Sequence, residues 1–330
     1  MVQELQIGGT RNETANITHV GREAVAGATR FNWQYAPWLL LIHLTALLAF
    51  VPWFFSWTGL VLGIVSYYVF NILGIGVCYH RLLAHRSYRC PLWLERLLSV
   101  FGACSVQDSP AYWVAIHRRH HQYADDQHDP HSPKVGLLWS HLGWLLVKKD
   151  DMKPATLIAR YAKDIMRDPF QAWLERSDNW FKFALATWLT YFAGGFGFAL
   201  ASGSGQADAV QFGLSLLVWG VAVRTVLGWH FAWAVNSLGH RWGYRNYDTP
   251  DDSRNNVLIG IFAGGEGWHN NHHADPGSAR HGHKRGEFDL AWLTIRLFKQ
   301  AGLATDVVEP SPALASRSIL KASQPPGHDR

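Results

Sequence analysis

Histidine dominates the residues of this chain that could do chemistry. Eighteen of the 330 residues are His, and eight of these fall in three short clusters. The clusters are His80-x4-His85, His117-x2-His120-His121 and His269-x2-His272-His273. Imidazole nitrogens bind transition metals, whereas calcium and magnesium prefer oxygen ligands. The clusters therefore predict a site for iron, zinc, copper, manganese or nickel.

The spacing within the clusters favours two metal ions over one. On a helix, residues three or four apart share a face, so His117 projects beside both His120 and His121. The side chains of His120 and His121 point about 100° apart around the helix, so they can bind different ions. His80 and His85 are about 140° apart on a helix, which suits residues that flank a pair of ions. Eight imidazoles are too many for one tetrahedral or octahedral centre, so we predict a dimetal site.

The elements that must position these clusters are apolar. No Lys or Arg occurs between Arg30 and Arg81, or between Lys182 and Arg224. These two stretches contain four apolar segments, each close to the roughly 20 residues that a helix needs to cross a bilayer. We predict transmembrane helices, paired as two hairpins, at residues 38–57, 60–79, 183–200 and 210–229.

The distribution of basic residues predicts the orientation in the membrane. The loops within the two hairpins lack Lys and Arg, so by the positive-inside tendency the remaining segments lie in the cytoplasm. We therefore predict an all-α integral membrane protein whose cytoplasmic helical cap holds the dimetal site. The chain would divide into a cytoplasmic arm (1–35), one catalytic domain (36–305) and a flexible tail (306–330). Both termini would be cytoplasmic.

Three single residues within this frame are expected to be structural. Arg224 falls inside the fourth apolar segment, where its long side chain could extend to the cytoplasmic interface. The isolated His43 and His141 are expected to be ordinary surface or core residues.

The composition and the position of the clusters limit the classes of protein. Only 17% of residues are charged, compared with about 25% in a typical soluble domain, which disfavours a disordered or nucleic-acid-binding chain. A polytopic metal transporter would also be rich in His. It would place polar ligands within its spans, whereas these clusters lie beyond the predicted helix ends. This position favours an enzyme.

Three sequence stretches resemble the histidine boxes of the membrane fatty acid desaturases, and they are most similar to the delta-nine group. They are His-Arg-Leu-Leu-Ala-His (80–85), His-Arg-Arg-His-His (117–121) followed by Asp-Pro-His-Ser-Pro (129–133), and Gly-Glu-Gly-Trp-His-Asn-Asn-His-His (265–273). The stretches Ser140-His141-x-Gly143-Trp144 and Ser278-Ala279-Arg280 also match, leaning toward plant and bacterial members. The resemblance covers about residues 60–305.

The resemblance implies a non-haem di-iron centre and adds two residues to the site. Asn236-Ser237-Leu238-Gly239-His240 matches a further family motif, in which Asn reaches its metal through a water molecule. In the implied arrangement, one iron is bound by His80, His85, His117, His121 and His272, and the other by His120, His240, His269, His273 and, through water, Asn236. Asp129 and Glu266 lie close enough in sequence to orient metal-bound imidazoles.

The implied reaction converts a CH2–CH2 unit of a saturated acyl chain to a cis double bond, using O2 and two electrons. A hydroxylase of the same superfamily is the alternative, because both reactions begin with hydrogen abstraction. The close match over residues 236–247 and 264–280 favours desaturation. No haem or flavin module is recognisable, so we expect a separate electron donor such as cytochrome b5, ferredoxin or rubredoxin. The membrane would be a bacterial inner membrane or the endoplasmic reticulum.

The resemblance also implies substrate contacts, but it leaves the acyl carrier open. Tunnel contacts are expected from Gln107, Trp113, Trp229 and Trp233. Lys148 and Lys149 match a basic pair that meets CoA, and we expect them to hold an anionic head group. However, Ala-Ile (115–116) stands where animal enzymes have Arg-Asp. Acyl-CoA, acyl-carrier protein and a glycerolipid therefore all remain candidate carriers.

Overall fold

The computed structural model describes residues 28–317, and most of these are helical. The predicted arm and tail therefore lie largely outside the described residues. The apolar half contains α2 (Ala36–Leu47), η1 (Leu48–Phe50), η2 (Pro52–Phe54), α3 (Trp57–Tyr67), η3 (Tyr68–Ala84), α9 (Asn179–Ala201), α10 (Gln206–Leu217), η8 (Val218–Val223) and α11 (Arg224–Ser237).

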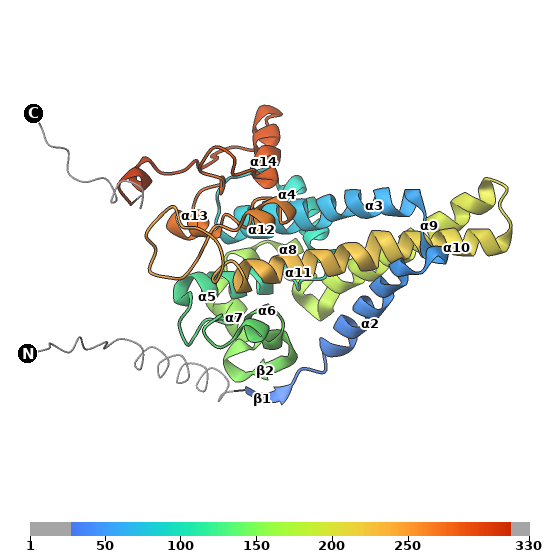
Figure 1. Ribbon diagram of the computed structural model, residues 1–330, viewed down its shortest axis with the longest axis horizontal. Coiled ribbons are helices and arrows are strands. Elements are labelled where there is room, and N and C mark those ends of the chain that lie inside the picture. Colours follow the sequence, from blue (N-terminus) through green and yellow to red (C-terminus); the bar gives the residue numbers. More distant parts are fainter. Residues whose placement is uncertain (1–27, 318–330) are drawn as a thin grey trace, which may run out of the picture.

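The remaining elements form a polar half at one end of the long helices (Figure 1). They are β1 (Ala28–Phe31), α4 (Leu92–Ala103), α5 (Pro110–Tyr123), α6 (Leu137–His141), η4 (Gly143–Leu146), β2 (Val147–Lys149), η5 (Asp150–Met152), α7 (Pro154–Tyr161), η6 (Ile165–Arg167), α8 (Pro169–Glu175), η7 (Arg176–Asp178), α12 (Val257–Phe262), α13 (His269–Ala274), α14 (Leu290–Gln300) and η9 (Pro312–Arg317).

Three helices in the described part of the chain are long and apolar enough to cross a membrane. They are Trp57–Ala84, Pro169–Ala201 and Gln206–Ser237, and a shorter apolar helix covers Ala36–Phe50. The first predicted segment thus ends earlier than expected. Val51 is extended (φ −92°, ψ 117°) because a residue that precedes proline is disfavoured in helical geometry, and Pro52 has no N–H to continue the helix.

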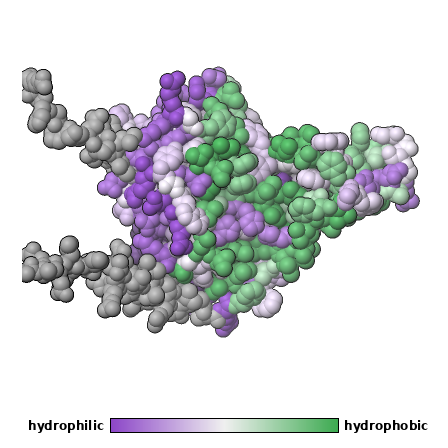
Figure 2. All heavy atoms as spheres, in the orientation of Figure 1, coloured by the Kyte–Doolittle hydropathy of each residue, from purple (hydrophilic) through white to green (hydrophobic). Residues whose placement is uncertain are grey.

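The surface separates into an apolar body and a polar end (Figure 2). Hydrophobic residues cover the long helices, and hydrophilic residues gather over the end that carries α5 and α13. Large outward-facing side chains on the long helices include Ile64 (64% exposed), Leu189 (66%) and Phe198 (66%). Apolar patches of this extent mark contact with lipid or protein.

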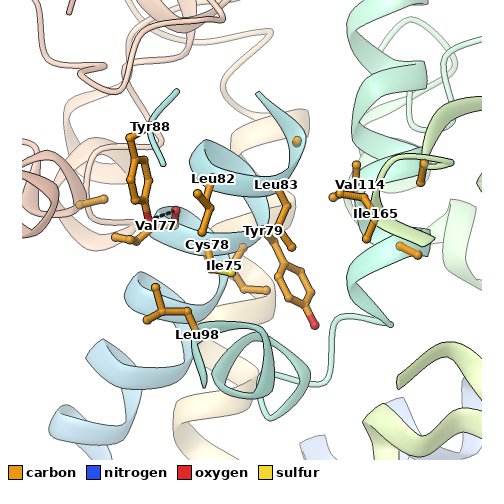
Figure 3. Packing of buried hydrophobic residues seen from close by; sticks show 14 of the residues in the cluster. Ile75, Val77, Cys78, Tyr79, Leu82, Leu83, Tyr88, Leu98, Val114 and Ile165 are labelled. Carbon is orange, nitrogen blue, oxygen red and sulfur yellow. Dashed lines mark hydrogen bonds between the residues drawn. The ribbon is translucent and has the colours of Figure 1, made fainter. Parts of the chain in front are cut away.

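The first of these long helices, Trp57–Ala84, is wound more widely than an α-helix from Tyr68 onward, with i→i+5 hydrogen bonding. It continues to Ala84, so it carries His80 directly into the polar half. This helix packs tightly on α4, where the backbone of Gly102 faces the Tyr79 ring. Figure 3 shows the surrounding core, in which Leu98 of α4 lies near Leu82 and the Tyr88 hydroxyl donates to the Val77 carbonyl (3.1 Å).

Two sequence-based expectations are wrong. The fold is not entirely α-helical, because β1 and β2 form an antiparallel pair in which Arg30 is opposite Lys148. The strands are more than 100 residues apart in sequence, and neither one is long enough to give a periodic pattern. Arg224 does not reach an interface. It is 1% exposed, and its guanidinium lies 4.5 Å from the centre of the Phe70 ring.

Candidate metal centre

Nine histidines meet at the inner end of the polar half, in two groups. Within each group, one candidate ligand atom from each member lies within 4.8 Å of the corresponding atoms of all the others. The first group takes residues from η3, its C-terminal end, α5 and α13: His80, His85, His117, His121 and His272. The second takes residues from α5, the turn after α11, and α13: His120, His240, His269 and His273.

The membership of these groups matches the division that the resemblance implied. The adjacent residues His120 and His121 separate into different groups, as their positions on one helix predict. Asn236, near the end of α11, lines a cavity that also reaches His269.

Within the first group, the Nε2 atoms face one another. The Nε2–Nε2 distance is 2.7 Å between His85 and His117 and 3.1 Å between His80 and His272. His272 Nε2 also lies 2.9 Å from His121 Nε2.

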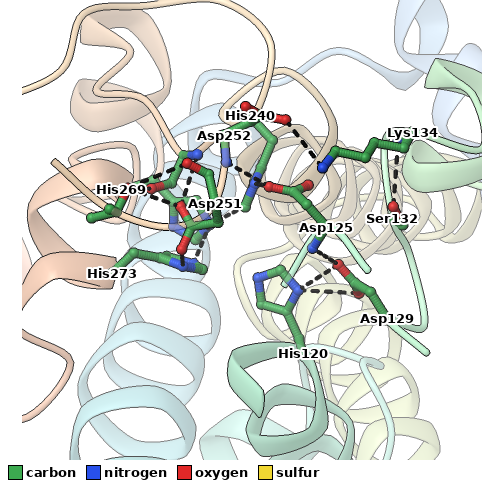
Figure 4. Close-up of polar contacts among 12 residues, drawn as sticks. His120, Asp125, Asp129, Ser132, Lys134, His240, Asp251, Asp252, His269 and His273 are labelled. Carbon is green, nitrogen blue, oxygen red and sulfur yellow. Dashed lines mark hydrogen bonds and ion pairs between the residues drawn. The ribbon is translucent and has the colours of Figure 1, made fainter. Parts of the chain in front are cut away.

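In the second group, carboxylates settle which nitrogen carries the proton (Figure 4). His240 Nδ1 donates to Asp125 (2.9 Å), and His273 Nδ1 donates to Asp251 (2.8 Å). In the neutral form of each ring, which is the form that binds metal, Nδ1 therefore keeps the proton and Nε2 carries the lone pair. Both lone pairs face His269 Nε2, at 2.9 and 3.1 Å.

A bound cation would account for these facing Nε2 lone pairs better than hydrogen bonds among the rings do. A neutral His269 has one N–H at most, so it cannot donate from Nε2 to both neighbours with good geometry. His120 Nε2 is fully buried and has no hydrogen-bond partner among residues 28–317, although His120 Nδ1 contacts Asp129 at 3.1 Å. A buried nitrogen without a partner costs about 1–3 kcal/mol. All-nitrogen donors with carboxylates behind them suit a transition metal such as iron.

Burial keeps most of these imidazoles in the neutral form that binds metal. It lowers the pKa of His117, His121, His269 and His272 well below the usual value, and neighbouring imidazoles lower the pKa further. Metal ligands must be deprotonated, so low pKa values favour occupancy at neutral pH.

Four of the nine histidines have a carboxylate behind them, and the sequence indicated only two of these partners. Glu266 accepts from His80 and also from Arg81 (3.0 Å), and Asp129 accepts from His120. Asp125 and Asp251 were missed, because they contact histidines 115 and 22 residues away. The sequence contains one signal for them, which is their position near the motifs. Asp125 follows His121 by four positions, and Asp251 lies between the stretches 236–240 and 265–273.

A cavity of about 350 Å³ leads to this centre. Its inner end is lined by His80, His117 and His269. The predicted tunnel residues Gln107, Trp113, Trp229 and Trp233 all line it. Trp113 stacks on His117 (5.1 Å between ring centres), and Trp229 stacks on Trp233 (5.7 Å).

The predicted basic pair lies elsewhere. Lys148 and Lys149 belong to β2, and neither lines the cavity. The Lys149 ammonium is 4.7 Å from the centre of the Trp139 ring, and burial lowers its pKa. Lys148 is exposed.

Comparison with known proteins places the chain in a family. A family model described as fatty acid desaturase matches residues 55–285. An sn-1 stearoyl-lipid 9-desaturase of Anabaena variabilis is 38% identical over 284 residues, which cover 86% of this chain and 96% of the relative. An sn-2 palmitoyl-lipid 9-desaturase of Nostoc sp. is 36% identical over 300 residues (91% and 98%).

An acyl-CoA 5-desaturase of Anemone leveillei is equally similar, with 39% identity over 272 residues that cover 82% of this chain and 77% of the relative. The similarity therefore extends across desaturases with different acyl carriers. The family match and the relatives agree with the histidine groups and the cavity that reaches them. The chain belongs to the fatty acid desaturase family, and it is an O2-dependent oxidoreductase that desaturates fatty acyl chains.

Proposed function

We propose that the protein introduces a cis double bond at carbon 9 of a saturated acyl chain, at a non-haem di-iron centre in a membrane. The observation that carries this proposal is the convergence of nine imidazoles, in two groups, on the inner end of an apolar cavity. The position of the double bond is supported by the relatives named as 9-desaturases.

Two irons would be held by the two histidine groups, with Asn236 contributing through a water molecule. Bound iron supplies the activation of O2 and the abstraction of hydrogen. The overall balance is R–CH2–CH2–R′ + O2 + 2 e⁻ + 2 H⁺ → R–CH=CH–R′ + 2 H2O. The protein positions the ligands through the carboxylate–histidine pairs and keeps bulk water away from the centre.

The cavity wall would fix which carbons react. Trp113 stacks on a ligand ring, so a chain that contacts this Trp lies beside the first histidine group. The stacked Trp229 and Trp233 form another part of the wall, and Trp229 Nε1 donates to the carbonyl of Val106, next to Gln107. Rigid aromatic walls hold a flexible chain at one register, as selectivity for one CH2–CH2 unit requires.

The proposed topology has four crossings, with both termini and the metal centre on the cytoplasmic side. The three long helices and the shorter α2 would form two hairpins joined at residues 51–56 and 202–205. The polar half lacks an electron-carrying module among the described residues, so reducing equivalents would come from a separate donor protein such as cytochrome b5, ferredoxin or rubredoxin. The membrane would be a bacterial inner membrane or the endoplasmic reticulum.

The test is expression in a bacterial auxotroph for unsaturated fatty acids, with gas chromatography–mass spectrometry of the lipids. We expect growth without supplement and new delta-9 monoenes. The His272→Ala variant, which removes a member of the first histidine group, should abolish both. Hydroxylated chains in place of monoenes would contradict desaturation and support a hydroxylase. Iron analysis of the purified protein should give two ions per chain.

A further inference from the structure

The wall formed by α2 differs from the rest of the cavity wall, because it is joined to the protein by little polar contact. Within residues 28–317, one side-chain hydrogen bond connects α2 to another element, from His230 Nε2 to His43 Nε2 (3.1 Å). The His43 Nδ1–H donates to the Leu39 carbonyl (2.6 Å), so His43 Nε2 is the acceptor. The remaining contacts of α2 are apolar, through residues such as Ile42.

This hydrogen bond belongs to a chain of three imidazoles outside the metal centre. His230 Nδ1 lies 2.9 Å from His141 Nε2, and His141 Nδ1 lies 2.9 Å from the Ser237 hydroxyl. The chain joins α2 to α11 and α6, so His43 and His141 are hydrogen-bonded residues outside the metal centre, in agreement with the sequence-based expectation, and they also connect elements. We call the contact between His43 and His230 the α2 latch.

The cavity reaches the surface beside α2. Its lining includes Trp38 and Leu39 of α2 together with Trp180 and Phe181 at the start of α9. Trp38 is 38% exposed, and its ring lies edge-on to Phe181, with the ring centres 5.0 Å apart. Within the described residues, no side-chain hydrogen bond joins α2 to α9. The contacts between α2 and α9 at this part of the cavity wall are thus apolar, and they include those of Trp38 with Phe181 and Trp188.

The surroundings at this point are the bilayer. The outer face of α2 exposes large apolar side chains, between 50% and 60% exposed, at Leu40, Leu41, Leu44 and Leu47. Such a face marks contact with lipid or protein, and its position on an apolar helix beside the three long ones favours lipid. Beyond α2, the extended Val51 and Pro52 interrupt the helix, so α2 can tilt about this point without bending α3. Figure 1 shows α2 running obliquely to α11.

The charges that line the cavity also favour a substrate that enters from the bilayer. Among the described residues, its lining contains no Lys or Arg, and its carboxyl groups include the exposed Asp178 together with Asp108 and Glu175, whose pKa values are raised by burial. A CoA thioester carries several phosphate charges, and this lining offers no cation to pair with them. An ester-linked chain in the bilayer brings no such group into the cavity.

Building on the proposed function, we propose that the substrate is the acyl chain of a bilayer glycerolipid, which passes sideways into the cavity between α2 and α9. The α2 helix is the movable wall, and the α2 latch holds it closed. The relatives do not decide this point, because both acyl-lipid and acyl-CoA desaturases are about equally similar to the chain.

A reversible cross-link tests the route. The double variant Trp38→Cys/Phe181→Cys, in the full-length iron-loaded protein, would be bridged with a bifunctional methanethiosulfonate and released with dithiothreitol. The assay uses vesicles of phosphatidylethanolamine and phosphatidylglycerol with deuterated stearoyl chains, and reduced ferredoxin as electron source. We expect the bridge to abolish desaturation of the vesicle lipid and its release to restore it, whereas each single-Cys variant, which the reagent modifies but cannot bridge, keeps most of the activity that it had before treatment.

Three outcomes would overturn the proposal. Undiminished lipid desaturation by the bridged protein would exclude the α2–α9 route. Preferential conversion of added stearoyl-CoA by the unbridged protein would exclude the glycerolipid as carrier. Failure of the unbridged, iron-loaded protein to convert either substrate would overturn the proposed function, and this inference with it.

A second measurement tests the latch without relying on turnover. Leu39→Cys in a Cys90→Ser background places a thiol in the cavity wall, and a membrane-dissolved maleimide reports its accessibility. Adding His43→Leu should raise the labelling rate severalfold. Adding Thr45→Val, which removes a hydroxyl bonded only within α2, should leave the rate unchanged. Equal rates in the two variants would show that the latch does not hold the wall.

Discussion

The pairing of imidazoles with carboxylates is the residue-level feature that prepares the metal centre. Each carboxylate accepts from Nδ1 of its histidine, which leaves Nε2 free to bind metal. At Asp251, burial opposes ionisation, but the hydrogen bond from His273 holds the pKa of this carboxyl below its usual range. The negative charge is thus kept where it can stabilise a bound cation.

Replacing this charge should weaken the second metal position. We expect Asp251→Asn to lower metal affinity or activity about 10–100-fold, the usual effect of losing a partner behind a metal ligand. Plasma mass spectrometry of iron, together with turnover, measures it. The adjacent Asp252→Asn is the matched control. The Asp252 side chain is half exposed and pairs with Lys134 (3.7 Å) instead of with a histidine. Equal iron content in both variants would contradict the role of Asp251.

Asp108 should make stability depend on pH. Burial raises its pKa to about 7, while the Tyr35 hydroxyl (2.6 Å) partly offsets this. The unfolded chain has a pKa of about 3.9 at this residue. The folded state therefore binds this proton more tightly, and its contribution to the free energy of unfolding is lost as the pH rises from about 4 to about 7.

The corresponding variant is Asp108→Asn, because Asn tolerates the positive φ of 72° at this position and can still accept from Tyr35. We expect it to raise the unfolding temperature in detergent more at pH 8 than at pH 5. A difference between variant and wild type that is the same at both pH values would show that Asp108 does not titrate in this range.

At the scale of elements, the close contact of η3 with α4 positions His80 and His85, two of the five members of the first histidine group. A Cβ built on Gly102 would lie 2.3 Å from Cε1 of Tyr79, one residue before His80. Small residues at such crossings let helix backbones approach within a membrane. The same helix supplies His85 at its end, so a shift of η3 moves two candidate ligands together.

Gly102→Ala should therefore destabilise the protein by about 1–3 kcal/mol, the usual cost of an overpacked core. It should also lower iron content, because His80 moves with Tyr79. Thermal unfolding in detergent and metal analysis measure the two effects. Gly194→Ala on α9 is the control, since a Cβ there meets nothing within 4 Å. Equal stability of the two variants would show that the contact can relax.

The positions of long helices could be predicted from apolar length, but their ends and pairings could not. The helix that begins at Trp57 runs to Ala84, five residues beyond its predicted end. The added residues are buried in the polar half of the protein, so they do not have to be apolar to remain helical. The ligand-bearing clusters were visible because His is rare and its spacing is regular. Asp125 and the β1–β2 pair were not, because their contacts depend on tertiary packing.

For the whole molecule, the apolar body lies between two polar ends, which the proposed topology assigns to opposite sides of the membrane. The link between α9 and α10 contains Ser and Gly, and the polar half contains the metal centre. Nine histidines separated by up to 193 positions converge in two groups, as the proposed pair of hairpins would require by returning the chain to one side.

Cysteine labelling tests this arrangement. In a Cys90→Ser background, Ser204→Cys should react with a membrane-impermeant maleimide in spheroplasts, because it lies on the outer side. Arg285→Cys, an exposed position in the polar half, should react only in inverted vesicles. Labelling of both positions from the same side would contradict the four-span topology.

The short α2 has a consequence for the bilayer itself. Together with η1 it covers Ala36–Phe50, which is 15 residues, or about 22 Å at 1.5 Å per residue, whereas a hydrocarbon core is about 30 Å thick. In the proposed topology, lipid next to α2 would thin to match it, at a cost that grows with the thickness of the membrane. Stiff, saturated bilayers resist such thinning more than unsaturated ones. A membrane that already contains more of the double bonds made by the enzyme would then deform more easily around α2.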